Sequence, residues 1–376
     1  MKSSLILGSL AIGVAVMMAT ACGPMNSEDN TNQTTCTVDA LKELEIVDDT
    51  VMNDGAAKNA SDGALGFRHI IETVAGRPEG ASPLTLAWLA DWAPPSFTCD
   101  WLRRRTENAC DATCGNCAGR TLDLAVAPFR LIAVSNRVDL VDEGSGPGEG
   151  RLVFAATQGS ADDDASAPLP LTVIFEFRLE GDASSWASRW HQLAAHSEMD
   201  AGYIADLAQI VGDFATTTTL GQARVNDEWS NSKGLLREFH LESAGAQPRL
   251  IASGLNRTPS HVLDGAPALT AFLNENRAAI LDDSYELPTA LLADRVELGL
   301  PWSLPGADPT AGPAFARGTC DGCHGSLQPT LAGGFHVSPF GRGSTKLSRF
   351  LLDPANRTGD ELARRATVMR RLACSP

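Results

Sequence analysis

Five consecutive residues near the C-terminus bring together reactive side chains. Cys320, Cys323 and His324 form a Cys-x-x-Cys-His pentapeptide. Two thiols at this spacing can close a disulfide or share a metal ion, and the adjoining imidazole is a metal ligand. With nine cysteines and seven histidines in 376 residues, chance predicts only about 0.004 such pentapeptides, so we interpret the pattern as a site.

The pentapeptide resembles the haem attachment motif of c-type cytochromes. The resemblance implies that Cys320 and Cys323 hold a haem c through thioether bonds to its two vinyl groups. It also implies that His324 is the proximal iron ligand. A structural disulfide is the main alternative. Zinc is a further alternative, although the sequence shows no second pair of ligands in register with the motif.

Two residues beyond the motif are candidates for a second axial ligand. His336 follows glycines 333 and 334, which permit a close backbone approach, and it would give a bis-histidine site. Met369 would supply a thioether and raise the reduction potential, unless it simply fills the core. We favour His336 of the two, and a five-coordinate iron is the remaining possibility.

The first 21 residues predict export. Lys2 precedes an apolar run over residues 5–18, which ends at Ala19-Thr20-Ala21-Cys22. This end resembles the lipobox of bacterial lipoproteins, which implies cleavage before Cys22, acylation of its thiol and anchoring to a membrane. Because Gly23 follows, the same resemblance implies the outer membrane. The alternative is an ordinary secretory peptide cut after Ala21. Export agrees with haem c, because that haem is attached after export.

Charge and cysteine content narrow the possible partners. The chain carries 46 acidic and 30 basic residues, a net charge of −16. We therefore expect no nucleic-acid partner, because phosphate binding needs a basic face. Eight cysteines besides Cys22 can form disulfides after export, in 105 possible pairings, and we assign none. The cysteines at 110, 114 and 117 lack a following histidine, so they predict disulfides rather than a second haem site.

Hydrophobic patterns predict a mixed fold. Alternating or β-branched runs predict strands over 129–134, 151–156, 171–179, 235–241 and 247–253. Helical spacing predicts helices over 39–46, 84–92, 184–196, 200–214 and 266–281, and the C-terminal segment has a helical stripe at Leu362, Ala366 and Met369. Strand clusters with inserted helices predict the α+β class, with antiparallel strands and a small, mainly helical C-terminal module.

We expect five regions along the chain. They are a lipoprotein signal peptide over 1–21, a tether over 22–36, a helical and cysteine-rich segment over 37–120, an α+β body over 121–300 and a Cys-x-x-Cys-His module over 301–376. The module resembles a cytochrome c domain only locally, through the pentapeptide.

A longer resemblance rests on residues 128–140, 148–154, 168–177 and 186–190. These stretches are similar to a group of lipoproteins of myxobacteria and their relatives. Those proteins also end in a Cys-x-x-Cys-His segment, followed by stretches that correspond here to 335–337 and 347–351. The resemblance spans roughly residues 120–375. It implies a shared architecture and supplies no activity.

These patterns predict an exported lipoprotein that carries haem c and transfers electrons to or from a redox partner that the sequence does not identify. A second hypothesis is a haem-free surface protein, for binding or for structure, that disulfides stabilise. A third is a haem-dependent, peroxidase-like enzyme whose pocket lies in the α+β body.

Overall fold

The computed structural model describes residues 36–59, 63–104, 120–144, 146–229, 235–243, 247–282, 284–298, 300, 302–325, 330–331, 334–352 and 361–374. Residues 1–36 and 37–376 separate into two units, and the second holds all the elements below. The predicted signal peptide, Cys22 with its expected lipid, tether residues 22–35 and the cysteines at 110, 114 and 117 lie outside the described residues.

Short and medium helices alternate with longer strands. The helices are α1 (Ala40–Glu43), α2 (Asp49–Met52), α3 (Phe67–Val74), α4 (Pro78–Trp92), α5 (Pro95–Leu102), α6 (Ala183–Gln192), α7 (Ala201–Phe214), α8 (Pro267–Glu275), α9 (Arg277–Leu281), α10 (Ala311–Gly318), α11 (Cys320–His324), α12 (Arg349–Leu352) and α13 (Glu361–Ala373). The strands are β1 (Glu45–Ile46), β2 (Phe129–Arg137), β3 (Glu149–Thr157), β4 (Pro168–Arg178), β5 (Leu220–Asp227), β6 (Leu235–Glu242), β7 (Arg249–Ser253) and β8 (Arg295–Glu297).

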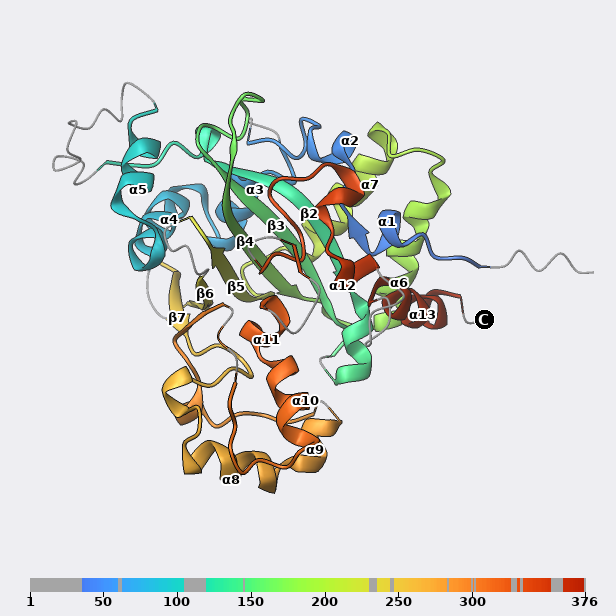
Figure 1. Ribbon diagram of the computed structural model, residues 1–376. Coiled ribbons are helices and arrows are strands. Elements are labelled where there is room, and N and C mark those ends of the chain that lie inside the picture. Colours follow the sequence, from blue (N-terminus) through green and yellow to red (C-terminus); the bar gives the residue numbers. More distant parts are fainter. Residues whose placement is uncertain are drawn as a thin grey trace, which may run out of the picture. The chain divides into compact units, whose positions relative to one another are not determined.

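The described strands form one antiparallel sheet (Figure 1). They follow the order β1-β2-β3-β4-β5-β6-β7. Strands β7 and β8 pair with different halves of β6. This arrangement confirms the predicted α+β class with antiparallel strands and C-terminal helices. Strands β5 and β8 had no counterpart in the sequence prediction.

One face of the sheet is aromatic and packs against helices. Phe67 of α3 stacks on Phe129 of β2 at a ring-centroid distance of 4.5 Å, and Trp88 of α4 lies 5.8 Å from Phe175 of β4. Phe154 of β3 joins the same buried cluster. Successive side chains of a strand point to opposite faces of the sheet. Phe129, Phe154 and Phe175 are the side chains of β2, β3 and β4 that face these helices. They make up the centre of the main hydrophobic core.

The predicted helix over 39–46 is wrong in its second half. Helix α1 ends at Glu43, and Glu45 and Ile46 form the edge strand β1. They pair with Ser135 and Val134 of β2, respectively. No local pattern indicates this change, because the hydrogen bonds that define β1 come from a strand almost ninety residues away in the chain.

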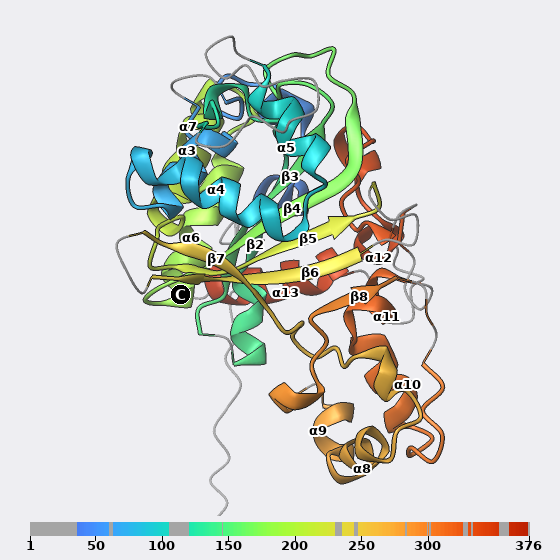
Figure 2. The ribbon, with the colours of Figure 1, turned by 90° about the vertical axis from the view of Figure 1, so that its left-hand side faces the viewer.

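The opposite face of the sheet carries a polar row. Glu45, Ser135, Arg151, Glu176 and Gln222 are successive partners across β1, β2, β3, β4 and β5. A polar sheet face normally meets water, yet Glu45, Ser135 and Glu176 are buried here. Figure 2 shows α3, α4 and α5 on one side of the sheet and α11 on the other. The segment that contains the pentapeptide therefore covers the polar face.

The described part of residues 301–376 contributes buried side chains to two hydrophobic clusters, and Cys320 packs against a third. Phe315 of α10 packs with α8 and α9, whereas Leu351 of α12 and Leu362, Ala366 and Met369 of α13 join the main core. The stripe predicted for the C-terminal helix is thus buried, in the core that also includes the sheet. Among the described helices, we find none with the length and apolar character required to cross a bilayer.

Candidate functional site

The pentapeptide forms a short helix against the end of α10. Thr319 caps α11, because its buried Oγ1 accepts a hydrogen bond from the Gly322 backbone N–H at 3.1 Å. A Cβ atom on Gly322 would lie 1.8 Å from the Ala316 carbonyl oxygen. Glycine is therefore required at this position of the motif, because α11 folds back so closely on α10.

A buried carboxylate, that of Asp321, holds α11 to residues outside the motif. The Asp321 side chain is fully buried and accepts hydrogen bonds from Nε2 of His261 at 2.7 Å and Nε1 of Trp302 at 3.2 Å. The rings of His261 and Trp302 stack at a centroid distance of 4.2 Å. The Cys320 backbone N–H also donates to Thr258 Oγ1 at 2.7 Å. These contacts hold the motif to residues that lie far from it in sequence.

Three potential metal-ligand atoms lie close together at the C-terminal end of α11. Cys323 Sγ lies 3.3 Å from Nε2 of His336, and the rings of His324 and His336 are 4.7 Å apart between centroids. Together the ligand atoms of Cys323, His324 and His336 lie within 4.8 Å of one another. The structure thus places His336 beside the motif, and its role as an iron ligand stays a prediction.

Both imidazoles of this cluster are oriented through their Nδ1 atoms. Nδ1–H of His324 donates to the Gly334 carbonyl oxygen at 2.8 Å, and Nδ1 of His336 lies 3.0 Å from the buried Ser348 Oγ. Gly334 has a φ of +66°, and a Cβ atom there would lie 2.3 Å from the His324 carbonyl oxygen. The backbone approach expected of the glycines before His336 thus occurs against His324, and it leaves Nε2 of His324 available to a ligand.

Burial keeps the cluster uncharged. It raises the pKa of the Cys323 thiol to about 12 and lowers the pKa of the His324 imidazole to about 4. Burial likewise lowers the pKa of His336 and raises that of the Cys320 thiol. At neutral pH the site therefore presents neutral imidazoles and protonated thiols.

The cluster opens onto a cavity of about 380 Å³ between the pentapeptide and the polar face of the sheet. This volume falls in the range of small-molecule sites. Six arginines and three glutamates line it, namely Arg137, Arg151, Arg224, Arg237, Arg257, Arg365, Glu45, Glu176 and Glu361. The Oδ1 atom of Asn226, also on this wall, is buried and has no hydrogen-bond partner among the described residues.

Ion pairs organise the charged wall. Glu176 Oε1 lies 3.3 Å from Arg151 and 3.2 Å from Arg224, and these two cations lower the pKa of Glu176 against the effect of burial. Arg224 also pairs with Glu238 at 3.3 Å. Most of the positive charge on the wall is thus balanced within the protein. The wall is polar and preorganised rather than strongly cationic.

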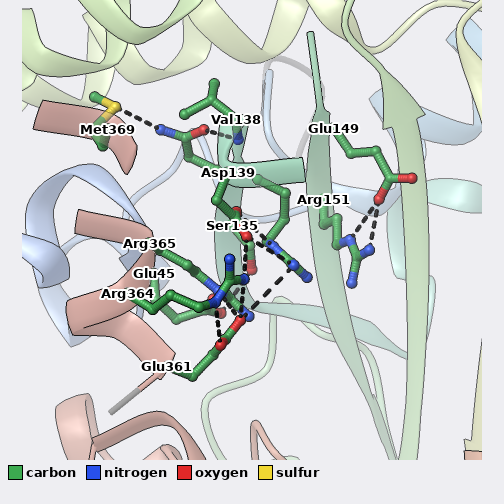
Figure 3. Close-up of polar contacts among 12 residues, drawn as sticks. Glu45, Ser135, Val138, Asp139, Glu149, Arg151, Glu361, Arg364, Arg365 and Met369 are labelled. Atoms are coloured by element: carbon green, nitrogen blue, oxygen red, sulfur yellow. Dashed lines mark hydrogen bonds and ion pairs between the residues drawn. The ribbon is translucent and has the colours of Figure 1, made fainter. Parts of the chain in front are cut away.

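Helix α13 supplies a second group of charges to the cavity (Figure 3). Arg365 pairs with Glu45 at 3.3 Å and with Glu361 at 3.0 Å. Arg364 pairs with Asp139 at 2.6 Å. The C-terminal helix is therefore joined to β1 and to the 3-10 turn Val138–Glu143 that follows β2 by buried or partly buried ion pairs, which fix one side of the cavity.

Met369 lies apart from the cluster of donor atoms. Its side chain is fully buried in the main core, and its sulfur accepts a hydrogen bond from Asn136 Nδ2 at 3.7 Å (Figure 3). Met369 is absent from the cavity lining, whereas Cys320, Cys323, His324 and His336 all belong to it. The structure therefore brings together four of the five candidate site residues of the C-terminal segment and places Met369 elsewhere.

The cysteines that the structure describes fall into two classes. Cys320 and Cys323 are free thiols, whereas Cys36, Cys99 and Cys374 are in disulfides. In this structure the two thiols of the pentapeptide thus remain available for other chemistry.

Sequence reasoning missed Asp321, His261, Trp302 and the charged wall as parts of the site. Asp321 was visible only as a variable position of the motif, and its partners lie 60 and 19 residues away. Searches of protein-family models, curated proteins and solved structures gave no match to this chain, so its own geometry carries the functional argument.

Proposed function

We propose that this protein is an exported lipoprotein that binds one haem c and transfers electrons. The observation that carries the proposal is the state of the pentapeptide. Its two thiols are free, and Nδ1 of His324 is committed to a backbone carbonyl, which leaves Nε2 as the ligand atom. Metal-binding histidines characteristically donate their other ring N–H to such a partner.

The residues around the motif fit a haem, because Cys320 and Cys323 line the same cavity as His324, so the attachment and ligand atoms share one space. The arginines of the wall that pair with carboxylates of the chain, such as Arg365, would surround the haem with fixed charge rather than with free cations. When bound, the haem supplies a one-electron centre whose potential depends on its axial ligands.

The chain's own residues would position that centre. Asp321 and Thr319 hold α11 in place, and Gly334 holds the ring of His324. His336 is our candidate for a second axial ligand, a role that requires its ring to move away from His324, because the two ring centroids are only 4.7 Å apart. Met369 is a weaker candidate because it lies outside the cavity. The polar wall surrounds the site with fixed charges, which set the electrostatic environment of a redox centre.

The proposed location of the protein, and hence of its redox partner, rests on the N-terminal sequence. We propose that Cys22 carries lipid and anchors the protein in the outer membrane, and that the electron donor or acceptor is another exported redox protein. Radiolabelled palmitate incorporation that Cys22→Ser abolishes would support the anchor. Unchanged incorporation in that variant would contradict it.

The haem proposal is tested by producing the full chain in cells that carry the c-haem maturation system. We expect covalent haem on denaturing gels and a pyridine haemochrome spectrum with both vinyl groups saturated. Cys320→Ser or Cys323→Ser should leave one thioether, which shifts that spectrum, and the double variant should lose covalent haem. His69→Ala, at an exposed position, is the matched histidine control. Colourless protein from these cells would contradict the proposal.

A further inference from the structure

The cluster of Cys323, His324 and His336 offers ligand atoms to a metal ion even when no haem is attached. We propose that the haem-free chain binds a single zinc ion through Cys323 Sγ and the Nε2 atoms of His324 and His336. In the structure, one ligand atom of each residue, the sulfur or an imidazole nitrogen, already lies within 4.8 Å of the other two. In the sequence, zinc was an alternative only for the pentapeptide and His336 was a candidate only for haem iron, because His336 stands well outside the motif.

The spacing of the rings favours a tetrahedral ion. At a zinc–nitrogen distance of about 2.0–2.1 Å, each imidazole centroid lies about 3.1 Å from the ion. Two such rings are then about 5 Å apart at a tetrahedral angle and about 6 Å apart on opposite sides of an ion. The observed separation of His324 and His336 is 4.7 Å. The rings are therefore placed for neighbouring positions on one ion rather than for opposite axial positions.

The thiol is placed in the same way. Zinc–sulfur and zinc–nitrogen bonds of about 2.3 Å and 2.0–2.1 Å at a tetrahedral angle put the two ligand atoms about 3.5 Å apart. Cys323 Sγ lies 3.3 Å from Nε2 of His336. Binding zinc requires the loss of the Cys323 proton to solvent, after which sulfur and two neutral imidazoles complete three of the four ligands.

The surroundings orient this ligand set before an ion arrives. The Gly334 carbonyl holds His324 through Nδ1, and the buried hydroxyl of Ser348 holds His336 in the same way. The Ser348 backbone N–H also donates to the His336 carbonyl oxygen at 2.9 Å. Three protein ligands with a fourth position open to a cavity are the arrangement of a catalytic rather than a structural zinc site.

Zinc and haem would compete for the same atoms but use different sets. Both need Cys323 and His324, whereas Cys320 serves only haem attachment and His336 is required for zinc. Cys320→Ser therefore separates the two ideas. It should retain the zinc site while it reduces haem attachment to one thioether, so the failure of either proposal is recognised independently of the other.

The test uses the full chain exported from cells without the haem maturation system and stripped of metal. Competition with a chromophoric chelator measures zinc affinity, and cobalt(II) reports tetrahedral thiolate ligation by its visible spectrum. We expect Cys323→Ser and His336→Ala to weaken the tightest site more than about 100-fold and Ser348→Ala to weaken it about tenfold, since supporting partners of a ligand account for 10–100-fold.

Two controls complete the design. Cys320→Ser and His69→Ala should stay within about threefold of the wild type, well below the effect of a lost supporting partner. Unchanged affinity in His336→Ala, or an equal loss in Cys320→Ser and Cys323→Ser, would overturn the proposal. If His336→Ala does not fold, Ser348→Ala and the cobalt spectrum of the wild type decide the question, and a spectrum without a sulfur-to-cobalt band would also overturn it.

Discussion

The carboxylate of Asp321 should be a main anchor of the pentapeptide, and Asp321→Asn tests this directly. The wild-type carboxylate is fully buried and accepts N–H groups from His261 and Trp302. The amide oxygen can still accept from Trp302, but the NH₂ group can pair with Nε2 of His261 only if that imidazole changes tautomer, and both contacts lose the negative charge of the carboxylate. Hydrogen bonds to a charged group contribute about 1.5–3 kcal/mol each. We therefore expect the variant to lose about 2–3 kcal/mol of unfolding free energy at pH 7.

Urea unfolding of the haem-free, metal-free chain measures this loss. The unfolding entropy of about 2.1 cal/mol/K per residue over residues 37–376 converts it to a fall in Tm of about 3–4 °C. Asp294→Asn, at an exposed position, is the matched control and should stay within about 0.5 kcal/mol of the wild type. If Asp321→Asn is equally silent, the anchoring role is refuted.

A second substitution separates the two hydrogen bonds. Trp302→Phe removes the indole N–H while it keeps an aromatic ring against His261. It should destabilise the chain by about 1–2 kcal/mol. Because both changes affect the same carboxylate, the double variant with Asp321→Asn should lose less than the sum of the single losses. Strict additivity would show that the two groups do not interact.

Three further predictions concern the body of the molecule. Neighbouring arginines lower the pKa of Asp139, so the stability that its carboxylate contributes is present above its ordinary pKa and is lost as the pH falls below about 4. In urea titrations at a series of pH values, Asp139→Asn should therefore reduce the loss of stability at acidic pH. Gly150→Ala should lower the free energy of unfolding by about 1–3 kcal/mol, because its Cβ would lie 2.5 Å from the Phe214 ring. Gly212→Ala, in open space on α7, should raise it by about 0.5–1 kcal/mol. Urea midpoints measure both changes. Met369→Leu should cost under about 1.5 kcal/mol and leave the absorption spectrum of matured protein unchanged.

Local sequence signals predicted those parts of the fold that local interactions determine. The apolar runs of β2, β3 and β4 and the helical spacing of α7 each appear in the structure near their expected bounds. Strand β5 was missed because its sequence over 220–227 is largely polar, and β8 has only three residues. Both acquire their conformation from neighbours in the sheet rather than from their own hydrophobic pattern.

The candidate site divides in the same way. The motif residues and the glycines at 333 and 334, shortly before His336, were visible, because spacing and backbone freedom are local properties. Asp321, His261 and Trp302 could not be associated, since nothing in their spacing brings them together. Arg151 and Glu176 lie in runs that predicted strands, but a polar position in a strand ordinarily predicts exposure to solvent. Only the folding of the C-terminal segment over these residues shows that they line a cavity.

The buried charges of that wall are difficult to explain by stability alone. Removing Glu45 and Arg365 from water costs several kcal/mol per ion, and well-packed apolar residues of similar volume are commonly as stable or more stable. The aromatic face of the same sheet packs through an apolar layer, so packing against this sheet does not require charged residues. Charges are instead concentrated on the face opposite two thiols and two imidazoles, where they can hold a polar ligand and fix its electrostatic surroundings. The asymmetry of the sheet thus points to the same cavity that the pentapeptide does.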